Sequence, residues 1–138
     1  MPSYVVVLIC LAVGVSAVVL VMVEVKKRRK PKAGRRQLDM AMVALTQVIR
    51  RNPNDGGAFT KLGIIKMKKN DLPGAIGDLS RALEIDASIT EARYHRGMAL
   101  QMSGDANGAR KDYQWIMSNS EDPFFKTAVS DRLKALKK

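Results

Sequence analysis

The chain repeats itself with a period of 34 residues, and this period constrains its fold more than any other feature. At that offset Gly63 aligns with Gly97 and Ala75 with Ala109, and one period upstream Ala41 aligns with Ala75. Periods of this length are typical of solenoids, in which each unit buries its apolar face only by stacking on its neighbours. The sequence therefore predicts a stack of repeated units from residue 37 to about residue 123.

The two complete units resemble the tetratricopeptide repeat (TPR), a family in which each repeat forms two antiparallel helices. The matching residues are Phe59, Leu62, Gly63, Ala75, Leu79 and Ala82 in unit 56–89, and Gly97, Ala109 and Tyr113 in unit 90–123. Three positions depart from the family pattern, because Lys66 replaces an aromatic residue, Arg96 a leucine and Ala87 the closing proline. The resemblance implies an all-α, TPR-like solenoid at residues 37–138. It comprises a half repeat (37–55), two repeats (56–89 and 90–123) and a capping helix (123–136).

The same residues predict how the helices pack. We expect helices at 37–51, 56–69, 72–84, 90–103, 106–118 and 123–136, with Asp71 and Asp105 as N-caps. Gly63 and Gly97 suit places where two helices approach so closely that a Cβ would collide. The residues expected at these contacts are Gly63, Ala75, Leu79, Ala82, Gly97, Ala109 and Tyr113. The apolar stripe of the capping helix consists of Phe124, Phe125, Ala128, Val129, Leu133 and Leu136.

The half repeat lacks its first helix, because another kind of sequence occupies that stretch. Its end around Leu38, Met40 and Met42 is therefore expected to be partly uncovered. Two and a half repeats is about the minimum for a stable stack. A partner protein or a bilayer surface would cover this end.

Residues 1–25 are predicted to be a single transmembrane anchor. Tyr4 to Val23 carries no charged side chain, and about 20 helical residues span the roughly 30 Å of a bilayer core. A cleaved signal peptide fits less well, since no basic residue precedes the run and the run is too long. Cys10 lies deep inside it, so we expect this thiol to be packed or lipid-facing rather than reactive.

Residues 26–36 form a basic segment without an acidic residue. Its eight basic residues are Lys26, Lys27, Arg28, Arg29, Lys30, Lys32, Arg35 and Arg36. By the positive-inside rule they predict an outside N-terminus and a repeat domain on the cytoplasmic or stromal-equivalent side. Contact with anionic lipid headgroups is a second interpretation, whereas nucleic acid is not an expected partner. Pro31 and Gly34 predict a juxtamembrane linker.

No enzyme, metal or cofactor chemistry is expected. The chain has one His and one Cys, and it contains no phosphate loop, dinucleotide-binding fingerprint or zinc-protease motif. His95 is interpreted as a structural or groove-lining residue. Glu121 and Asp122 precede Pro123 and suit the start of a helix.

The TPR resemblance implies a concave groove that binds an extended peptide or a partner helix. The groove residues so implied are Thr60, Ile64, Met67, Tyr94, Met98 and Gln101, although Ile64 and Met67 fit the helix core equally well. Ile64 and Met98 stand where family members that clamp chaperone C-termini carry Asn, so that clamp is not expected. Trp115 either packs on the capping helix or offers an exposed anchor to a partner.

These features favour a membrane-tethered adaptor or scaffold that aids assembly or stability of a membrane protein complex. A receptor for presequences or client polypeptides is one alternative, with Asp86 and Glu91 as its few acidic groups. A permanent structural subunit packed through its transmembrane helix is the other. In each case the partner is a protein, and the bilayer supplies the second contact.

Overall fold

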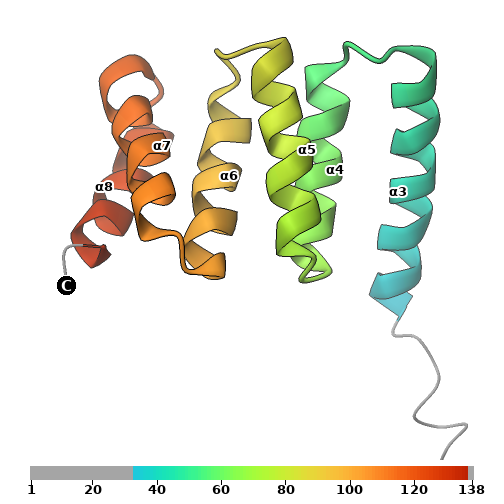
Figure 1. Cartoon of the computed structure of the whole chain (residues 1–138), viewed down its shortest axis with the longest axis horizontal. Coiled ribbons are helices and arrows are strands. Elements are labelled where there is room, and N and C mark those ends of the chain that lie inside the picture. Colours follow the sequence, from blue (N-terminus) through green and yellow to red (C-terminus); the bar gives the residue numbers. More distant parts are fainter. Residues whose placement is uncertain (1–32, 137–138) are drawn as a thin grey trace, which may run out of the picture. The chain divides into compact units, whose positions relative to one another are not determined.

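The computed structural model describes residues 33–136, which form six α-helices (Figure 1). They are α3 (Ala33–Arg51), α4 (Gly56–Lys68), α5 (Leu72–Ile85), α6 (Thr90–Ser103), α7 (Ala106–Asn119) and α8 (Pro123–Ala135). The helices α4 and α6 begin at equivalent positions of the 34-residue period, as do α5 and α7. The all-α helical repeat predicted from the period is therefore confirmed.

The chain divides into two units, residues 1–36 and residues 37–138. The predicted membrane span and most of the basic segment lie outside the described residues. Within residues 33–136 no helix has the length and apolar character needed to cross a membrane. The helix α3 begins at Ala33, four residues before the start at residue 37 that the sequence predicted. Gly34 lies in the exposed first turn of α3, and no atom lies near the position that a Cβ would occupy. It therefore lowers the stability of α3 only through the low intrinsic helix propensity of glycine.

Acidic side chains begin most of the helices. Asp71 accepts a hydrogen bond from the backbone N–H of Gly74 at 3.0 Å, and Asp105 accepts one from Gly108 at 2.8 Å. Both are N-caps as predicted, since each carboxylate satisfies a backbone donor that the helix leaves free. Asp55 caps α4 in the same way, and Asp122 caps α8.

The turn inside each repeat has the same backbone geometry. Asn70 and Gly104 occupy equivalent positions before these caps, and both have positive φ angles, 64° and 94° respectively. Gly and Asn are the residues that adopt this left-handed conformation most readily. The chain can therefore reverse sharply between the two helices of a repeat.

Two glycines set the distance between the helices of each repeat. A Cβ at Gly63 would lie 2.6 Å from Leu79 Cγ, and a Cβ at Gly97 would lie 2.5 Å from Tyr113 Cε1. Any other residue at either position must push the paired helices apart. The predicted packing residues Ala75, Leu79, Ala82, Ala109 and Tyr113 are fully buried at these contacts.

The core forms two clusters along the stack. The first contains Ala75, Leu79, Ala82, Leu83, Ala92 and Ala99. The second contains Ala109, Tyr113, Ile116 and Val129. Because α5 packs on α6 as well as on α4, the two repeats are joined through a continuous series of helix contacts.

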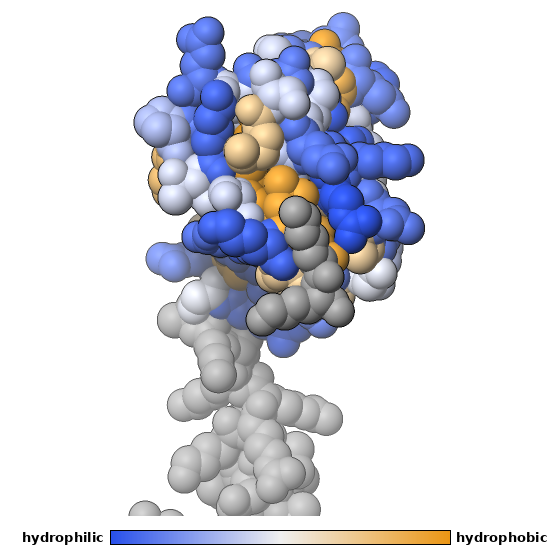
Figure 2. Space-filling model, turned by 90° about the vertical axis from the view of Figure 1, so that its left-hand side faces the viewer, coloured by the Kyte–Doolittle hydropathy of each residue, from blue (hydrophilic) through white to orange (hydrophobic). Residues whose placement is uncertain are grey.

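The last helix, α8, packs on α7 and closes this end of the described stack. Val129 is fully buried, and Phe125, Leu133 and Leu136 pack against the second cluster. Arg110 of α7 also donates to the backbone carbonyl of Leu136 at 2.9 Å. Phe124 is 67% exposed, so its assignment to the apolar stripe was wrong. Figure 2 shows this end, where mostly hydrophilic side chains surround a smaller apolar area.

Candidate partner-binding groove

The first helices of the repeats share one side of the stack. The helix α6 contacts both α4 and α8, in addition to the second helices. In the view of Figure 1, α5 lies in front of α4 and α7 in front of α8. A surface lined by α4, α6 and α8 is therefore formed by side chains that are far apart in the sequence.

Ile64 and Met98 are the apolar residues of this surface. They occupy equivalent positions on α4 and α6, and both are half-buried. Neither side chain belongs to the two core clusters described above. Half-buried apolar side chains of this kind can pack against an apolar side chain of a partner, which removes both from water.

Charged groups from all three first helices meet at His95. The imidazole experiences the charges of Lys68 from α4, Glu91 from α6 and Arg132 from α8. Burial lowers the pKa of His95 below its usual value, because desolvation disfavours the charged ring. Two cations, Lys68 and Arg132, and one anion, Glu91, thus lie within electrostatic reach of His95.

Two predicted groove residues lie deeper than expected. Thr60 is only 2% exposed, and its hydroxyl donates to the carbonyl of Gly56 at 2.8 Å. A hydroxyl satisfied by its own helix can be buried, so Thr60 lies in the interior. Met67 is half-buried and packs against the first cluster. The structure thus places Met67 at the core, the alternative that sequence reasoning had left open.

Tyr94 and Gln101 take part in a network that joins α6, α7 and α8. Gln101 Oε1 accepts from the Tyr113 hydroxyl at 3.0 Å and from Arg132 at 3.4 Å. The Arg132 guanidinium lies 5.6 Å from the centre of the Tyr94 ring, and Phe125 lies 5.5 Å from the same ring. Gln101 Oε1 and the Tyr94 hydroxyl, which accepts a hydrogen bond from Arg132 at 3.4 Å, therefore already have partners within the fold.

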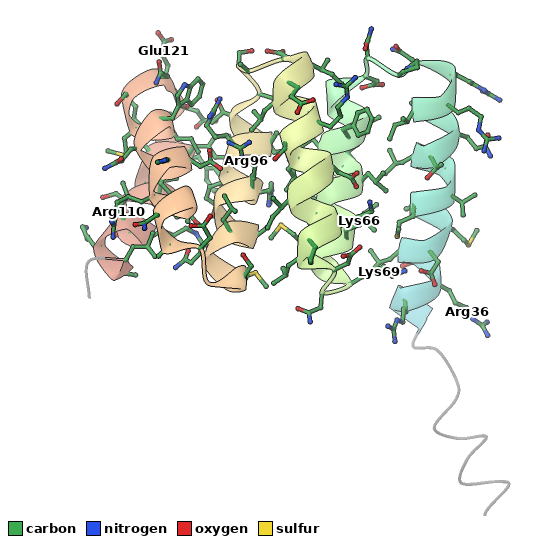
Figure 3. All side chains as sticks on the ribbon, viewed as in Figure 1. Arg36, Lys66, Lys69, Arg96, Arg110 and Glu121 are labelled. Atoms are coloured by element: carbon green, nitrogen blue, oxygen red, sulfur yellow. The ribbon has the colours of Figure 1, made fainter. Side chains whose placement is uncertain are left out.

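Two departures from the repeat pattern are matched by aspartates that sequence reasoning missed. Lys66 forms an ion pair with Asp78 at 2.7 Å, and Arg96 donates to both oxygens of Asp112 at 2.8 and 2.6 Å (Figure 3). Asp78 and Asp112 occupy equivalent positions of α5 and α7. Their shared position in the period was the signal that would have revealed them.

The Arg96–Asp112 pair is part of a larger cluster. Arg96 also donates to the Ser80 hydroxyl at 3.3 Å, and Arg93 lies 3.5 Å from Asp112. Hydrogen bonding to Asp112 raises the pKa of Arg96, whereas burial lowers the pKa of Arg93. The Arg93 guanidinium lies 4.0 Å from the Trp115 ring centre. Trp115 is half-buried and packs against the second cluster, which favours a structural role over that of an exposed anchor.

Comparison with known proteins finds the fold but no sequence family. No protein-family model matches the chain, and no curated protein sequence matches it. Among solved structures, the first TPR of Spaghetti (RPAP3) bound to the HSP90 peptide SRMEEVD is similar, with TM-score 0.68, 19% identity and coverage of 75% of this chain and 80% of that chain.

Two further structures share the architecture. The Yersinia enterocolitica type III secretion chaperone SycD, in complex with a peptide of the translocator YopD, matches with TM-score 0.68 and 21% identity over 73% of this chain and 80% of that chain. The Arabidopsis OM64 TPR domain matches with TM-score 0.67 and 18% identity over 72% of this chain and 83% of that chain. The chain has a TPR-like helical-repeat fold.

Proposed function

We propose that this protein is a membrane-tethered adaptor whose TPR-like unit binds a segment of another protein. The observation that carries the proposal is the convergence of α4, α6 and α8 on one surface. There, the apolar Ile64 and Met98 accompany the charged groups around His95. Similar folds hold peptides, since one is bound to an HSP90 peptide and another to a translocator peptide.

The charges of this surface favour an acidic or neutral partner segment over a basic one. Two positive charges, those of Lys68 and Arg132, lower the pKa of His95, whereas the one negative charge near it, that of Glu91, raises this pKa. Asp86, the other acidic group considered for a receptor, accepts hydrogen bonds from Ser88 in the turn after α5. A basic presequence would meet like charges here, so we favour the adaptor over the presequence receptor.

The tether is part of the same proposal and depends on the sequence. Tyr4 to Val23 is uncharged, and eight basic residues follow within residues 26–36. A tether raises the concentration of the repeat unit near a membrane-bound partner, so a modest affinity suffices. Alkaline carbonate extraction tests it: the full chain should stay in the membrane pellet, and a chain lacking residues 1–25 should not. Full extraction of both would remove the tether from the proposal.

A pull-down from mild detergent with paired variants tests the groove. Met98→Glu places a charge on the apolar strip, whereas Met117→Glu makes the same change at an exposed methionine of α7, which is 39% exposed. Mass spectrometry should find a stoichiometric partner with the wild type and with Met117→Glu but not with Met98→Glu. A partner retained by a folded Met98→Glu chain would move the contact away from the groove. Retention only by chains with residues 1–25 would favour the structural-subunit alternative.

A further inference from the structure

The half repeat presents an open helix face whose counterparts in both complete repeats are covered by a helix. One period downstream of Ala41, Leu45 and Val48 lie Ala75, Leu79 and Ala82, and two periods downstream lie Ala109, Tyr113 and Ile116. All six of these downstream residues are fully buried. In contrast, Ala41 and Leu45 are only half-buried, and Val48 is 41% exposed.

The covering element in the complete repeats is the first helix of the same repeat. The helix α4 packs on α5 and α6 packs on α7, with Gly63 and Gly97 at the closest approach. Among the described residues, no helix precedes α3 to play this part (Figure 1). We call the surface formed by Ala41, Ala44, Leu45 and Val48 the open face.

The other sides of α3 differ from the open face in their residues and in their counterparts. Leu38, Met42 and Ile49 form a half-buried stripe, and Asp39 forms an ion pair with Lys69 at the end of α4 (Figure 3). Val43 is 64% exposed, but its counterparts Gly77 and Lys111 are exposed too. Exposure of Val43 is therefore a normal property of this fold, whereas exposure of Val48 is not.

The chemistry of the open face indicates what covers it. Ala44 stands where the complete repeats carry Asp78 and Asp112, the partners of Lys66 and Arg96. The covering helix therefore meets no carboxylate here and needs an apolar residue rather than a cation. Opposite Leu45 it needs a small residue, as Gly63 is opposite Leu79.

Charge selects between the candidate sources of this helix. The last turn of α3 carries Arg50 and Arg51 without an acidic residue, and the sequence before α3 is strongly basic. A second copy packed through the same face would bring these arginines together, and residues 26–32 are also basic. Like charges at an interface are unfavourable, so an acidic helix is the better complement.

We propose that the open face of α3 binds an amphipathic, acidic helix of a partner protein, which completes the first repeat. This interface is separate from the groove of α4, α6 and α8, so the two sites are open to independent tests. Its occupant would bury an apolar stripe with a small residue at its centre, and its acidic residues would lie near Arg50 and Arg51.

A synthetic peptide derived from α4 is the probe. It carries residues 55–69 with Lys66→Leu, which faces Ala44, and with Lys61, Lys68 and Lys69 replaced by Glu; a control peptide has the same Lys66→Leu change but keeps the other three lysines. Fluorescence anisotropy follows binding of each labelled peptide to the full chain in mild detergent. We expect saturable binding of the acidic peptide and at least about tenfold weaker binding of the basic one.

Three variants locate the contact. Val48→Asp should weaken binding of the acidic peptide by at least about tenfold, because it places a charge within the apolar interface and a carboxylate opposite an acidic helix. Val43→Asp makes the same change on another side of α3, and Met98→Glu alters only the groove. Both should leave binding within about twofold of the wild type.

Five results would overturn this proposal. The first is no saturable binding of the acidic peptide, and the second is equal binding by wild type and Val48→Asp. The third is a dimer of the chain alone that Val48→Asp dissociates, which would make a second copy the occupant. The fourth is that the chain lacking residues 1–25 binds anionic lipid vesicles and that Val48→Asp abolishes this binding. Loss of peptide binding in Met98→Glu alone would assign the acidic peptide to the groove instead.

Discussion

At the scale of single residues, the fold tolerates polar departures from its repeat pattern because each has a partner at an equivalent place. Lys66 meets Asp78, and Arg96 meets Asp112, although the two basic residues occupy different positions within their repeats. A buried charge without a partner is costly. The aspartates of α5 and α7 thus allow the first helices to carry cations where the TPR pattern has an aromatic residue or a leucine.

Asp112→Ala should destabilise the chain more than Asp78→Ala. The Asp112 side chain is 4% exposed and serves two arginines, whereas the Asp78 side chain is 16% exposed and serves one lysine. We expect a loss of about 3 kcal/mol for the first change and about 1 kcal/mol for the second. Urea unfolding followed by Trp115 fluorescence measures both, since the chain has a single tryptophan. Equal losses would contradict the role assigned to Asp112.

Gly63→Ala should also lower the free energy of unfolding, by about 1–3 kcal/mol, because the added methyl group overpacks the contact with Leu79. Gly77→Ala is the matched control in the next helix. Nothing lies near the position of its Cβ, so the better helix propensity of Ala should stabilise the chain by about 0.5–1 kcal/mol. The same unfolding experiment compares them, and two changes of the same sign would argue against the close approach at Gly63.

His95 should make stability depend on pH near neutrality. Unfolded His takes up a proton at about pH 6.5, whereas burial lowers the pKa of His95 in the folded chain. The unfolded state therefore binds more protons between these two values, and the free energy of unfolding should fall as the pH drops through about 6.5. His95→Gln should flatten this dependence between pH 7.5 and 5.5 in urea unfolding, within the range of about one pH unit on either side of 6.5. An unchanged slope would show that His95 is not desolvated.

At the scale of helices, the sequence predicted most boundaries because the signals are local. The caps Asp71 and Asp105 lie directly before α5 and α7, and the glycine–alanine period places the packing faces. The burial of individual side chains was harder to predict, since it depends on how neighbouring helices pack. Thr60 is buried and Phe124 is exposed, and neither outcome follows from helical periodicity alone.

The candidate groove was predicted only in part for the same reason. Ile64 and Met98, which the resemblance implied for the groove, are half-buried and lie outside both core clusters. The contributions of His95 and Arg132 depend on α8 lying close to α6, a contact that the period does not encode. The hydrogen bonds of Gln101 to Tyr113 and Arg132 arise from the same three-helix contact.

The capping helix α8 offers a prediction at this scale. Val129 is fully buried against the second cluster, whereas Phe124 on the same helix is 67% exposed. Val129→Ala should cost about 1–3 kcal/mol through lost burial and a residual cavity, and Phe124→Ala should change stability by less than about 0.5 kcal/mol. Thermal unfolding followed by circular dichroism measures both. A larger loss for Phe124→Ala would mean that α8 packs through a different face.

At the scale of the whole molecule, the described residues combine a stack closed by α8 at one end with an incompletely covered α3 at the other. The candidate binding surface of α4, α6 and α8 lies between these ends. Residues 1–36 form a separate unit, whose sequence supports a membrane tether. In the adaptor that we propose, this division separates the tether from the binding surface, so the two can be altered independently.

The most direct measurement is methyl NMR of the full chain with ¹³C-labelled methionine, in the presence and absence of the partner recovered by the pull-down. The eight methionines include Met98 in the groove and Met117 on α7, which serves as an internal control. Binding should shift the Met98 methyl resonance and leave that of Met117 unchanged. A shift of Met117 with no change at Met98 would contradict the groove as the working surface of this protein.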